Sequence, residues 1–279
     1  MISVIIPTWN RGHNLRKVLT ALTKQEYQDF EVIIVDDKST DGTPSLIEEF
    51  KSRLPNFIYI YNNNRPTWDC ARPRNIGIKI AKGELICILD SDIVLSETAL
   101  KQAWEDYTEY PERIILGRYD WLKENFYPEH DIMVNAIDTL MGRPEYWVMP
   151  DYRREVFETV KNTQLFYSYP HALNCLGGHI YIPRAIYDLL GTYDEEMQMV
   201  EDGDFGIRSW KVQIPKSYDN RIRGYHLAHE IDPQRNLKAA EQLKKLNQKH
   251  FQVDYMPVET ILNNQEKWLQ VPKFEDRNI

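Results

Sequence analysis

Two carboxylates directly follow a short apolar run in the first third of the chain. Asp90, Ser91 and Asp92 come after Leu85–Leu89, which is too short for a typical helix and has the composition of a buried strand in a parallel sheet. In open α/β sheets, ligands bind beyond the carboxyl ends of the strands, and side chains two residues apart point to the same side. Asp90 and Asp92 could therefore hold Mg²⁺ or Mn²⁺ together with a diphosphate. The structural alternative is a turn or helix cap at the end of a strand.

Two histidines in the last quarter of the chain form a second candidate group of metal ligands. His226 and His229 stand three residues apart, so a turn in this segment would present both imidazoles to the same ion. Imidazole is compatible with Mn²⁺ when carboxylate and phosphate oxygens complete the coordination shell. The alternative is an ordinary structural role, which is the more common one for a single histidine.

Strands and helices alternate along the first 95 residues. Apolar, β-branched runs at Ile2–Pro7, Phe30–Val35 and Phe57–Tyr61 predict strands, and apolar residues at helical spacing follow the first two. An irregular segment, Asn62–Arg74, then precedes a helix over about 75–82 and the acidic strand. This alternation is typical of a doubly wound α/β sheet. The sequence contains neither GxGxxG nor GxxxxGK[ST], so a nucleotide would depend on carboxylates and a metal instead of a glycine-rich loop.

The remaining two-thirds of the chain has a less regular pattern. A helix over 98–110 and a strand at Ile114–Gly117 precede residues 118–174, which are crowded with aromatic side chains. Such a segment is either a lid or acceptor site or a helical insertion whose aromatics form a core. Residues 237–251 predict a basic amphipathic helix that packs on the domain or lies on a membrane surface, with packing the better interpretation.

Composition excludes several classes of function. The net charge of −8 argues against a nucleic-acid partner. Cys70, Cys87 and Cys175 are far apart and lack CxxC spacing, which indicates neither a disulfide framework nor a zinc site and favours a reducing compartment, the cytoplasm. The amino terminus lacks the basic segment of a signal peptide, and no apolar stretch reaches the roughly 18 residues that span a bilayer. Any membrane contact is expected to be peripheral.

Four segments resemble, in order, the motifs of family 2 glycosyltransferases with the GT-A fold: Val4–Arg11, Val32–Thr43, Arg74–Gly77 and Asp90–Asp92. The resemblance implies an α/β fold with a Rossmann-like, mostly parallel central sheet flanked by helices, and we expect a C-terminal helical extension. It divides the chain into a domain at 1–232, with a nucleotide-binding half at 1–95 and an acceptor half at 96–232, and an extension at 233–279. The implied activity is metal-dependent, inverting transfer from a nucleoside-diphosphate sugar, above all a UDP-sugar, to a hydroxyl of a glycan or other acceptor.

Several residues match positions that bind the donor in this family. The matching positions are Pro7, Thr8, Asn10 and Arg11 in the first loop, Asp36 and Asp37 near the base, Arg74 near the base or diphosphate, and Asp90, Ser91 and Gly178 near the diphosphate and sugar. Arg65 and Arg72 compete with Arg74 because this segment departs from the usual spacing. Structural alternatives are a loop cap for Asp36, a turn for Asn10 and a surface ion pair for Arg74.

The segment from Cys175 to Phe205 resembles the acceptor side of family 2 enzymes and of family 7 galactosyltransferases. Displacement at an anomeric carbon needs a base for the acceptor hydroxyl. By motif position Asp202 is the expected base, Glu201 orients the acceptor, and Asp204 caps the helix or supports the site. The alternative is that all three acids only decorate a helix amino terminus. The same resemblance makes His226 and His229 expected metal ligands beside Asp90 and Asp92, with His229 slightly favoured.

Two other classes of protein share parts of this pattern. A sugar-1-phosphate nucleotidyltransferase also uses an α/β sheet with paired acids and a metal. Those enzymes usually carry a glycine-rich, basic first loop, which Pro7–Asn14 does not supply. A non-catalytic module that binds nucleotide sugars or glycans is the third hypothesis, and the acids at 90–92 and 201–204 argue against it.

Overall fold

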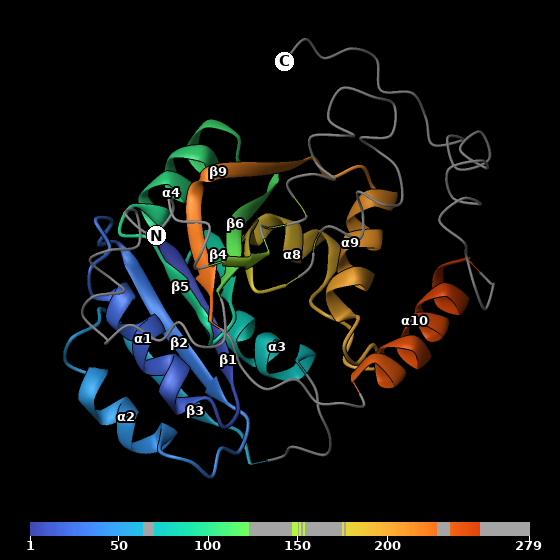
Figure 1. Cartoon of the computed structure of the whole chain (residues 1–279). Coiled ribbons are helices and arrows are strands. Elements are labelled where there is room, and N and C mark those ends of the chain that lie inside the picture. Colours follow the sequence, from blue (N-terminus) through green and yellow to red (C-terminus); the bar gives the residue numbers. More distant parts are fainter. Residues whose placement is uncertain are drawn as a thin grey trace.

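The computed structural model describes residues 1–63, 70–122, 147–149, 151, 153, 175, 177–227 and 235–251, with the backbone alone for 147–149 and 235–240. The strands of this part of the chain form one sheet in the order β3-β2-β1-β4-β8-β6-β9-β5, and β7 pairs with β6 (Figure 1). One sheet therefore runs through both predicted halves. No helix in these residues is long and apolar enough to cross a membrane.

The first half of the sheet is parallel and connected by helices. Its elements are β1 (Ile2–Thr8), α1 (Gly12–Leu22), β2 (Phe30–Asp36), α2 (Thr43–Phe50), β3 (Phe57–Tyr61), α3 (Ala71–Ile80) and β4 (Leu85–Leu89). The strands β1, β2 and β4 are buried on both faces, as their apolar sequences predict. In the register of β1 and β2, Thr8 lies opposite Asp36, so the polar strand ends meet at one edge of the sheet.

The second half of the sheet mixes parallel and antiparallel pairs. Its elements are β5 (Ile93–Leu95), α4 (Ala99–Glu109), β6 (Ile114–Leu122), β7 (Trp147–Met149), β8 (His179–Pro183), α8 (Arg184–Leu190), α9 (Glu201–Lys211) and β9 (Lys216–His226). Strand β8 runs antiparallel between β4 and β6, and β9 lies between β6 and β5. The antiparallel register of β5 and β9 pairs Ile93 with His226, which brings the end of β9 to the acidic segment after β4.

Helices cover both faces of the sheet because alternate strand residues face opposite cores. Val4 and Ile6 of β1 pack into a core that includes residues of α1, α2 and α4. Ile5, between them, packs into a second core with residues of α3, α8 and α9. A third, smaller cluster joins α9 to α10 (Arg235–Phe251), the outermost helix on that side of the molecule (Figure 1).

The predicted alternation of strands and helices in the first 95 residues is confirmed, and two boundaries differ. Helix α3 begins at Ala71, four residues before the predicted start near 75, so Arg74 lies in its first turn and not in a loop. Strand β6 continues to Leu122, beyond the predicted Gly117, because it gains β9 and β7 as partners. Most of the aromatic-rich segment 118–174, together with Arg65, His229 and the tail after Phe251, lies outside the described residues.

We predict that Gly77→Ala destabilises the fold by about 2 kcal/mol through overpacking. A Cβ at Gly77 would lie 2.4 Å from Cγ2 of Ile5, which is fully buried. This clash outweighs the gain of about 1 kcal/mol that alanine brings to a helix interior. Urea denaturation followed by circular dichroism measures the change. Gly42→Ala is the control, because nothing lies within 4 Å of its added Cβ. Equal stability of the two variants would contradict the predicted packing of α3 on β1.

Candidate active site

The first loops at the carboxyl edge of the sheet are held together by polar contacts. Asn10 has a left-handed backbone, with φ of +49°, and its Oδ1 accepts a hydrogen bond from the Thr40 N–H at 2.7 Å. The Asn10 N–H in turn donates to Ser39 Oγ at 2.9 Å. Asn10 thus joins the loop after β1 to the loop after β2. These two hydrogen bonds connect two loops and are not those of a local turn, so the predicted contact of Asn10 with a donor stays a prediction.

Asp36 and Asp37 differ in what their carboxylates contact. Asp36 is fully buried, and its two oxygens accept hydrogen bonds from the Ser39 N–H at 2.8 Å and the Tyr59 hydroxyl at 2.7 Å. Asp37, one residue further, accepts a hydrogen bond from Asn62 Nδ2 at 2.8 Å. Asp36 therefore shapes the loop, and Asp37 lies just beyond the strand end, so that its contact with a base stays a prediction.

Asp90 lies against the Gly177–Gly178 segment. Its N–H donates to the Gly178 carbonyl at 2.9 Å, and Gly178 adopts φ of +111°, which side chains other than glycine rarely tolerate. A Cβ at Gly178 would lie 3.0 Å from Asp90 Oδ2. The glycine pair noted in the sequence therefore lets the backbone approach the first carboxylate of the acidic segment.

Arg74 connects the two acidic elements of the chain. Its guanidinium is buried and donates to Asp90 Oδ1 at 3.1 Å and to Glu201 Oε1. It also lies over the ring of Tyr193, 5.6 Å from the centroid. The structural alternative for Arg74 was a surface ion pair; its pair with Glu201 is instead buried, its pair with Asp90 is partly exposed, and together they link the end of β4 to the start of α9. Burial raises the pKa of Glu201 above its usual range, and Arg74 offsets part of that effect.

Asp202 is held by backbone amides. Its carboxylate accepts hydrogen bonds from the N–H groups of Gly177 and Gly203, both at 2.7 Å. Burial raises the pKa of Asp202, against the opposing effect of Arg74 and of these two amides. A carboxylate with a raised pKa is a stronger base than an ordinary aspartate. The Gly177 contact places Asp202 next to the segment that also contacts Asp90.

Asp92 and His226 meet although 133 residues separate them in the sequence. His226 Nε2 lies 3.5 Å from Asp92 Oδ1, and the Leu227 N–H donates to the Asp92 carbonyl at 2.8 Å. The indole of Trp121 stacks on the His226 ring, with centroids 3.7 Å apart and planes inclined by 22°. Trp121 thereby orients the imidazole toward Asp92.

This pair fits a divalent cation. One carboxylate oxygen and one imidazole nitrogen lie close enough to bind the same ion, since bonds of about 2.1 Å allow separations up to about 4 Å. The mixed oxygen and nitrogen donors suit Mn²⁺. Within the described residues, no three His, Cys, Asp or Glu side chains form a complete cluster. His229 lies outside those residues, so the expectation that it is a ligand stays a prediction.

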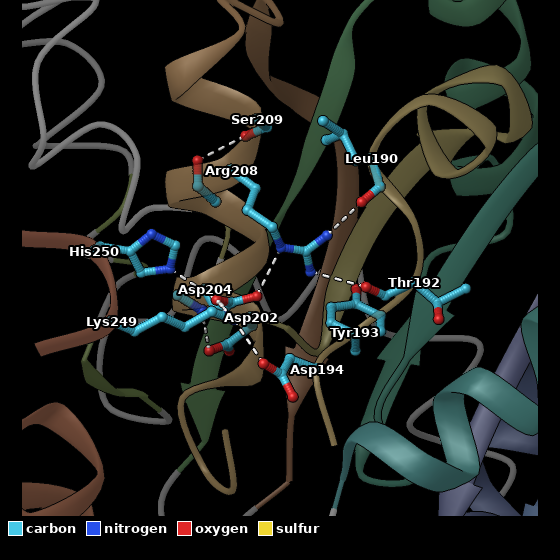
Figure 2. A network of polar contacts seen from close by, with 12 residues as sticks. Leu190, Thr192, Tyr193, Asp194, Asp202, Asp204, Arg208, Ser209, Lys249 and His250 are labelled. Atoms are coloured by element: carbon cyan, nitrogen blue, oxygen red, sulfur yellow. Dashed lines mark hydrogen bonds and ion pairs between the residues drawn. The ribbon is translucent and has the colours of Figure 1, made fainter. Parts of the chain in front are cut away.

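Asp204 has a different role from its neighbour Asp202. It is fully buried and accepts hydrogen bonds from Arg208 Nε at 2.7 Å, Lys249 Nζ at 2.6 Å and His250 Nε2 at 2.7 Å (Figure 2). Burial opposes its ionisation, but these donors outweigh burial and hold the pKa of Asp204 well below its usual range. The carboxylate is thus a charged anchor for α10.

The sequence analysis missed the contributions of α10 and of Gly177. The candidate acids were visible as motifs, but nothing in their neighbourhood indicated that Lys249 and His250 bind Asp204. The pair Gly177–Gly178 was the available signal for the Asp202 contact. Among the predicted donor-binding residues, Arg74, Asp90 and Gly178 come together, while Asn10 and Asp36 both contact the loop after β2. Arg72, the competitor of Arg74, instead pairs with Glu195 at 3.1 Å.

Comparison with known proteins places the chain in a family. The family model for glycosyl transferase family 2 matches residues 3–174, more than half of the chain. Glycosyltransferase GlyG of Streptococcus pneumoniae serotype 4 is 32% identical over 130 residues, which are 46% of this chain and 42% of GlyG. The chain thus spans less than half the length of this curated relative.

Two solved structures share the fold. A crystal structure of Staphylococcus aureus TarS 1–349 in complex with UDP-GlcNAc matches 93% of this chain and 69% of that chain, with a TM-score of 0.65 and 20% identity. The mannosyltransferase PcManGT from Pyrobaculum calidifontis, in complex with GDP-Man and Mn²⁺, matches 95% of this chain and 68% of that chain, with a TM-score of 0.64 and 15% identity. The predicted α/β fold of the GT-A type is confirmed.

We predict that Asp204→Asn lowers the free energy of unfolding by about 3 kcal/mol at pH 7, because it removes a buried, paired charge. Since the pKa of Asp204 is depressed in the folded state, its ionisation stabilises the fold above the ordinary Asp pKa of about 3.9. That contribution starts to fall below about pH 4 and is lost as the pH falls through the lower folded-state pKa, so the stability difference should narrow below about pH 4 and close only in stronger acid. Urea denaturation at several pH values measures this.

Asp188→Asn, on the exposed surface of α8, is the control for the Asp204 variant. It should leave the pH dependence of stability unchanged. A loss of stability in Asp204→Asn that stays the same from pH 7 down to about pH 2 would show that packing, not charge, explains the effect.

Proposed function

The chain belongs to glycosyl transferase family 2, and on that premise we propose that it transfers a sugar from a nucleoside-diphosphate sugar to an acceptor hydroxyl. The donor is proposed to be a UDP-sugar, in keeping with the UDP-GlcNAc bound by the TarS structure of the same fold. The acceptor class is a hydroxyl of a glycan or of a comparable molecule. We further propose that the reaction needs a divalent metal and inverts the anomeric carbon.

The observation that carries this proposal is the joint contact of Arg74 with Asp90 and Glu201. Asp90 follows β4 on the donor side, whereas Glu201 begins α9 on the acceptor side. One buried cation between them means that both acidic elements border the same place, as a transfer between two substrates requires. Asp202 is tied to this place through the Gly177 N–H.

The proposed reaction assigns a role to each acid. Asp202 accepts the proton of the acceptor hydroxyl while the hydroxyl oxygen forms a bond to the anomeric carbon. The bond from that carbon to the diphosphate oxygen breaks at the same time, and the nucleoside diphosphate leaves with the electron pair. Glu201, held by Arg74, orients the acceptor. One candidate base on the acceptor side is consistent with a single displacement, and therefore with inversion.

The residues proposed to hold the metal are Asp92 and His226, with His229 as a further candidate; among the described residues Asp90, also predicted as a ligand, does not complete a three-ligand cluster with them. A bound divalent ion would neutralise charge on the leaving diphosphate. Asp90 also contacts Arg74, so its carboxylate faces a fixed positive charge on the protein side. Trp121 holds the imidazole of His226 in place through ring stacking.

We predict that Asp202→Asn reduces the turnover of donor at least about 100-fold, because the amide cannot accept the acceptor proton. Release of UDP or GDP from UDP-GlcNAc, UDP-glucose and GDP-mannose measures turnover, and calorimetric titration with UDP measures binding. The affinity for UDP should stay unchanged, since Asp202 lies on the acceptor side. Asp188→Asn serves again as the control. Full turnover in Asp202→Asn would exclude Asp202 as the base.

We predict that UDP binds tightly with Mn²⁺ and at least about tenfold more weakly with EDTA, and that Asp92→Asn removes this difference. Calorimetric titration measures the affinity. Because Trp121 stacks on His226, binding of paramagnetic Mn²⁺ should also quench the fluorescence of Trp121. The Trp121→Phe variant should therefore show less quenching by Mn²⁺ than the wild type. Mg²⁺, which does not quench, is the control. Equal affinity for UDP in Mn²⁺ and in EDTA would contradict the proposed metal site.

A further inference from the structure

The first turn of α9 has no side-chain cap from the residue before it, and within the helix it is held by the hydrogen bonds from the Asp204 N–H to the Val200 carbonyl at 2.9 Å and from the Gly203 N–H to Asp202 Oδ1 at 2.7 Å. Its N-cap residue, Val200, makes no side-chain hydrogen bond to the helix. Met199, just before it, adopts a left-handed backbone with φ of +63°, which is strained for a residue with a long side chain. Because the N-cap residue supplies no side-chain acceptor, contacts from elsewhere in the chain add to the hydrogen bonds that fix Glu201 and Asp202 at the start of α9.

Helix α10 supplies those contacts. We use the term α10 contact for the side chains of Leu246, Lys249 and His250 against α9 and the loop before it. Leu246 is fully buried in a cluster that includes Val200, and Lys249 and His250 both bind Asp204 in the first turn (Figure 2). The α10 contact thus joins the N-cap residue to the carboxylate two positions beyond Asp202.

Lys249 also fixes the loop that leads into α9. Its ammonium lies 2.6 Å from Asp204 Oδ1 and 2.6 Å from Asp194 Oδ2, so one cation ties the helix to that loop. Arg208 adds hydrogen bonds from its guanidinium to the carbonyls of Leu190 and Thr192, both at 2.8 Å. Lys249 and Arg208 therefore both connect Asp204 in the first turn of α9 to the loop that precedes this helix.

The proton on His250 is placed by its two neighbours. Lys211 Nζ lies 3.1 Å from His250 Nδ1, and an ammonium can only donate, so Nδ1 accepts. Nε2 then carries the proton and donates a hydrogen bond to Asp204 Oδ1. A neutral donor with this geometry is all that the contact requires, which makes glutamine a suitable replacement for His250.

We propose that the α10 contact orients the Glu201–Asp202 element for catalysis, and that Lys249 and His250 are positioning residues. This inference rests on the proposed function, because it assumes that Asp202 is the base. The residues act through Asp204: they fix the first turn of α9, and with it the hydrogen bonds of Asp202 to the Gly177 and Gly203 amides. Loss of the α10 contact should weaken the hydrogen bonds that the Gly177 and Gly203 N–H groups donate to Asp202. Gly177 is the more informative of the two, because it is not part of α9 or α10.

Hydrogen exchange measured by mass spectrometry tests the positioning without a substrate. The full chain carrying Lys249→Met and His250→Leu is compared with the wild type. The amides of Gly177 and Gly203 should exchange at least about tenfold faster, while those of β1 and β4 stay unchanged. Lys245→Met, an exposed lysine on the same helix, is the matched control and should change neither. Faster exchange confined to α10 would overturn the proposal.

Donor turnover provides the second measurement. Release of UDP from UDP-GlcNAc should fall about tenfold to hundredfold in the double variant, with the affinity for UDP unchanged. His250→Gln, which keeps a neutral donor, should restore most of the activity that His250→Leu removes. If the double variant does not fold, the single variants Lys249→Met and His250→Leu take its place. Unchanged turnover in variants with loosened amides would refute the catalytic role of the contact.

The two proposals can fail separately. A wild-type protein that neither binds UDP nor releases it from any donor tested would refute the proposed function. In that case the exchange of the Gly177 and Gly203 amides would still show whether α10 fixes the start of α9. Conversely, an active enzyme whose Gly177 amide is insensitive to the α10 contact would refute only the positioning role.

Discussion

The arrangement of the candidate site depends on one buried cation. The guanidinium of Arg74 cannot lose its charge, so its burial in α3 requires negative partners close by. Asp90 after β4 and Glu201 at the start of α9 provide them. A buried ion pair contributes little net stability, because the cost of removing the charges from water offsets their attraction. The main effect of these pairs is therefore to fix the positions of Asp90 and Glu201 around Arg74. Donor-side and acceptor-side carboxylates are thereby fixed relative to each other.

Asp202 and Asp204 lie in the same helical turn, yet their surroundings shift their pKa values in opposite directions. Asp204 faces Arg208, Lys249 and His250, which lower its pKa and keep it ionised at neutral pH. Asp202 faces backbone amides and is raised in pKa by burial, so it can exchange a proton more readily. Sequence spacing alone makes the two look alike. The difference comes from Arg208 of α9 together with Lys249 and His250 of α10, which all contact Asp204.

The family relationship and the fold do not end at the same residue. The family model stops at residue 174, whereas the structural match to TarS covers 93% of the chain. The strands β8 and β9 and the helix α9 lie after residue 174, yet they complete the same sheet and carry the acceptor-side acids. The residues beyond the family model therefore belong to the same folded unit as those within it.

The sequence by itself determined the local features. Apolar runs such as Ile2–Pro7 and Leu85–Leu89 fixed the strands because burial on both faces demands continuous apolar residues, and the acids at their ends marked one edge of the sheet. Tertiary structure alone decided which distant groups meet. His226 reaches Asp92 through the register of β5 and β9, Arg74 pairs with Glu201 across 127 positions, and α10 selects Asp204. The periodicity of apolar residues indicates which face of a helix or strand is buried. Which side chains from distant parts of the chain meet at a site is decided by strand register and by the packing between elements.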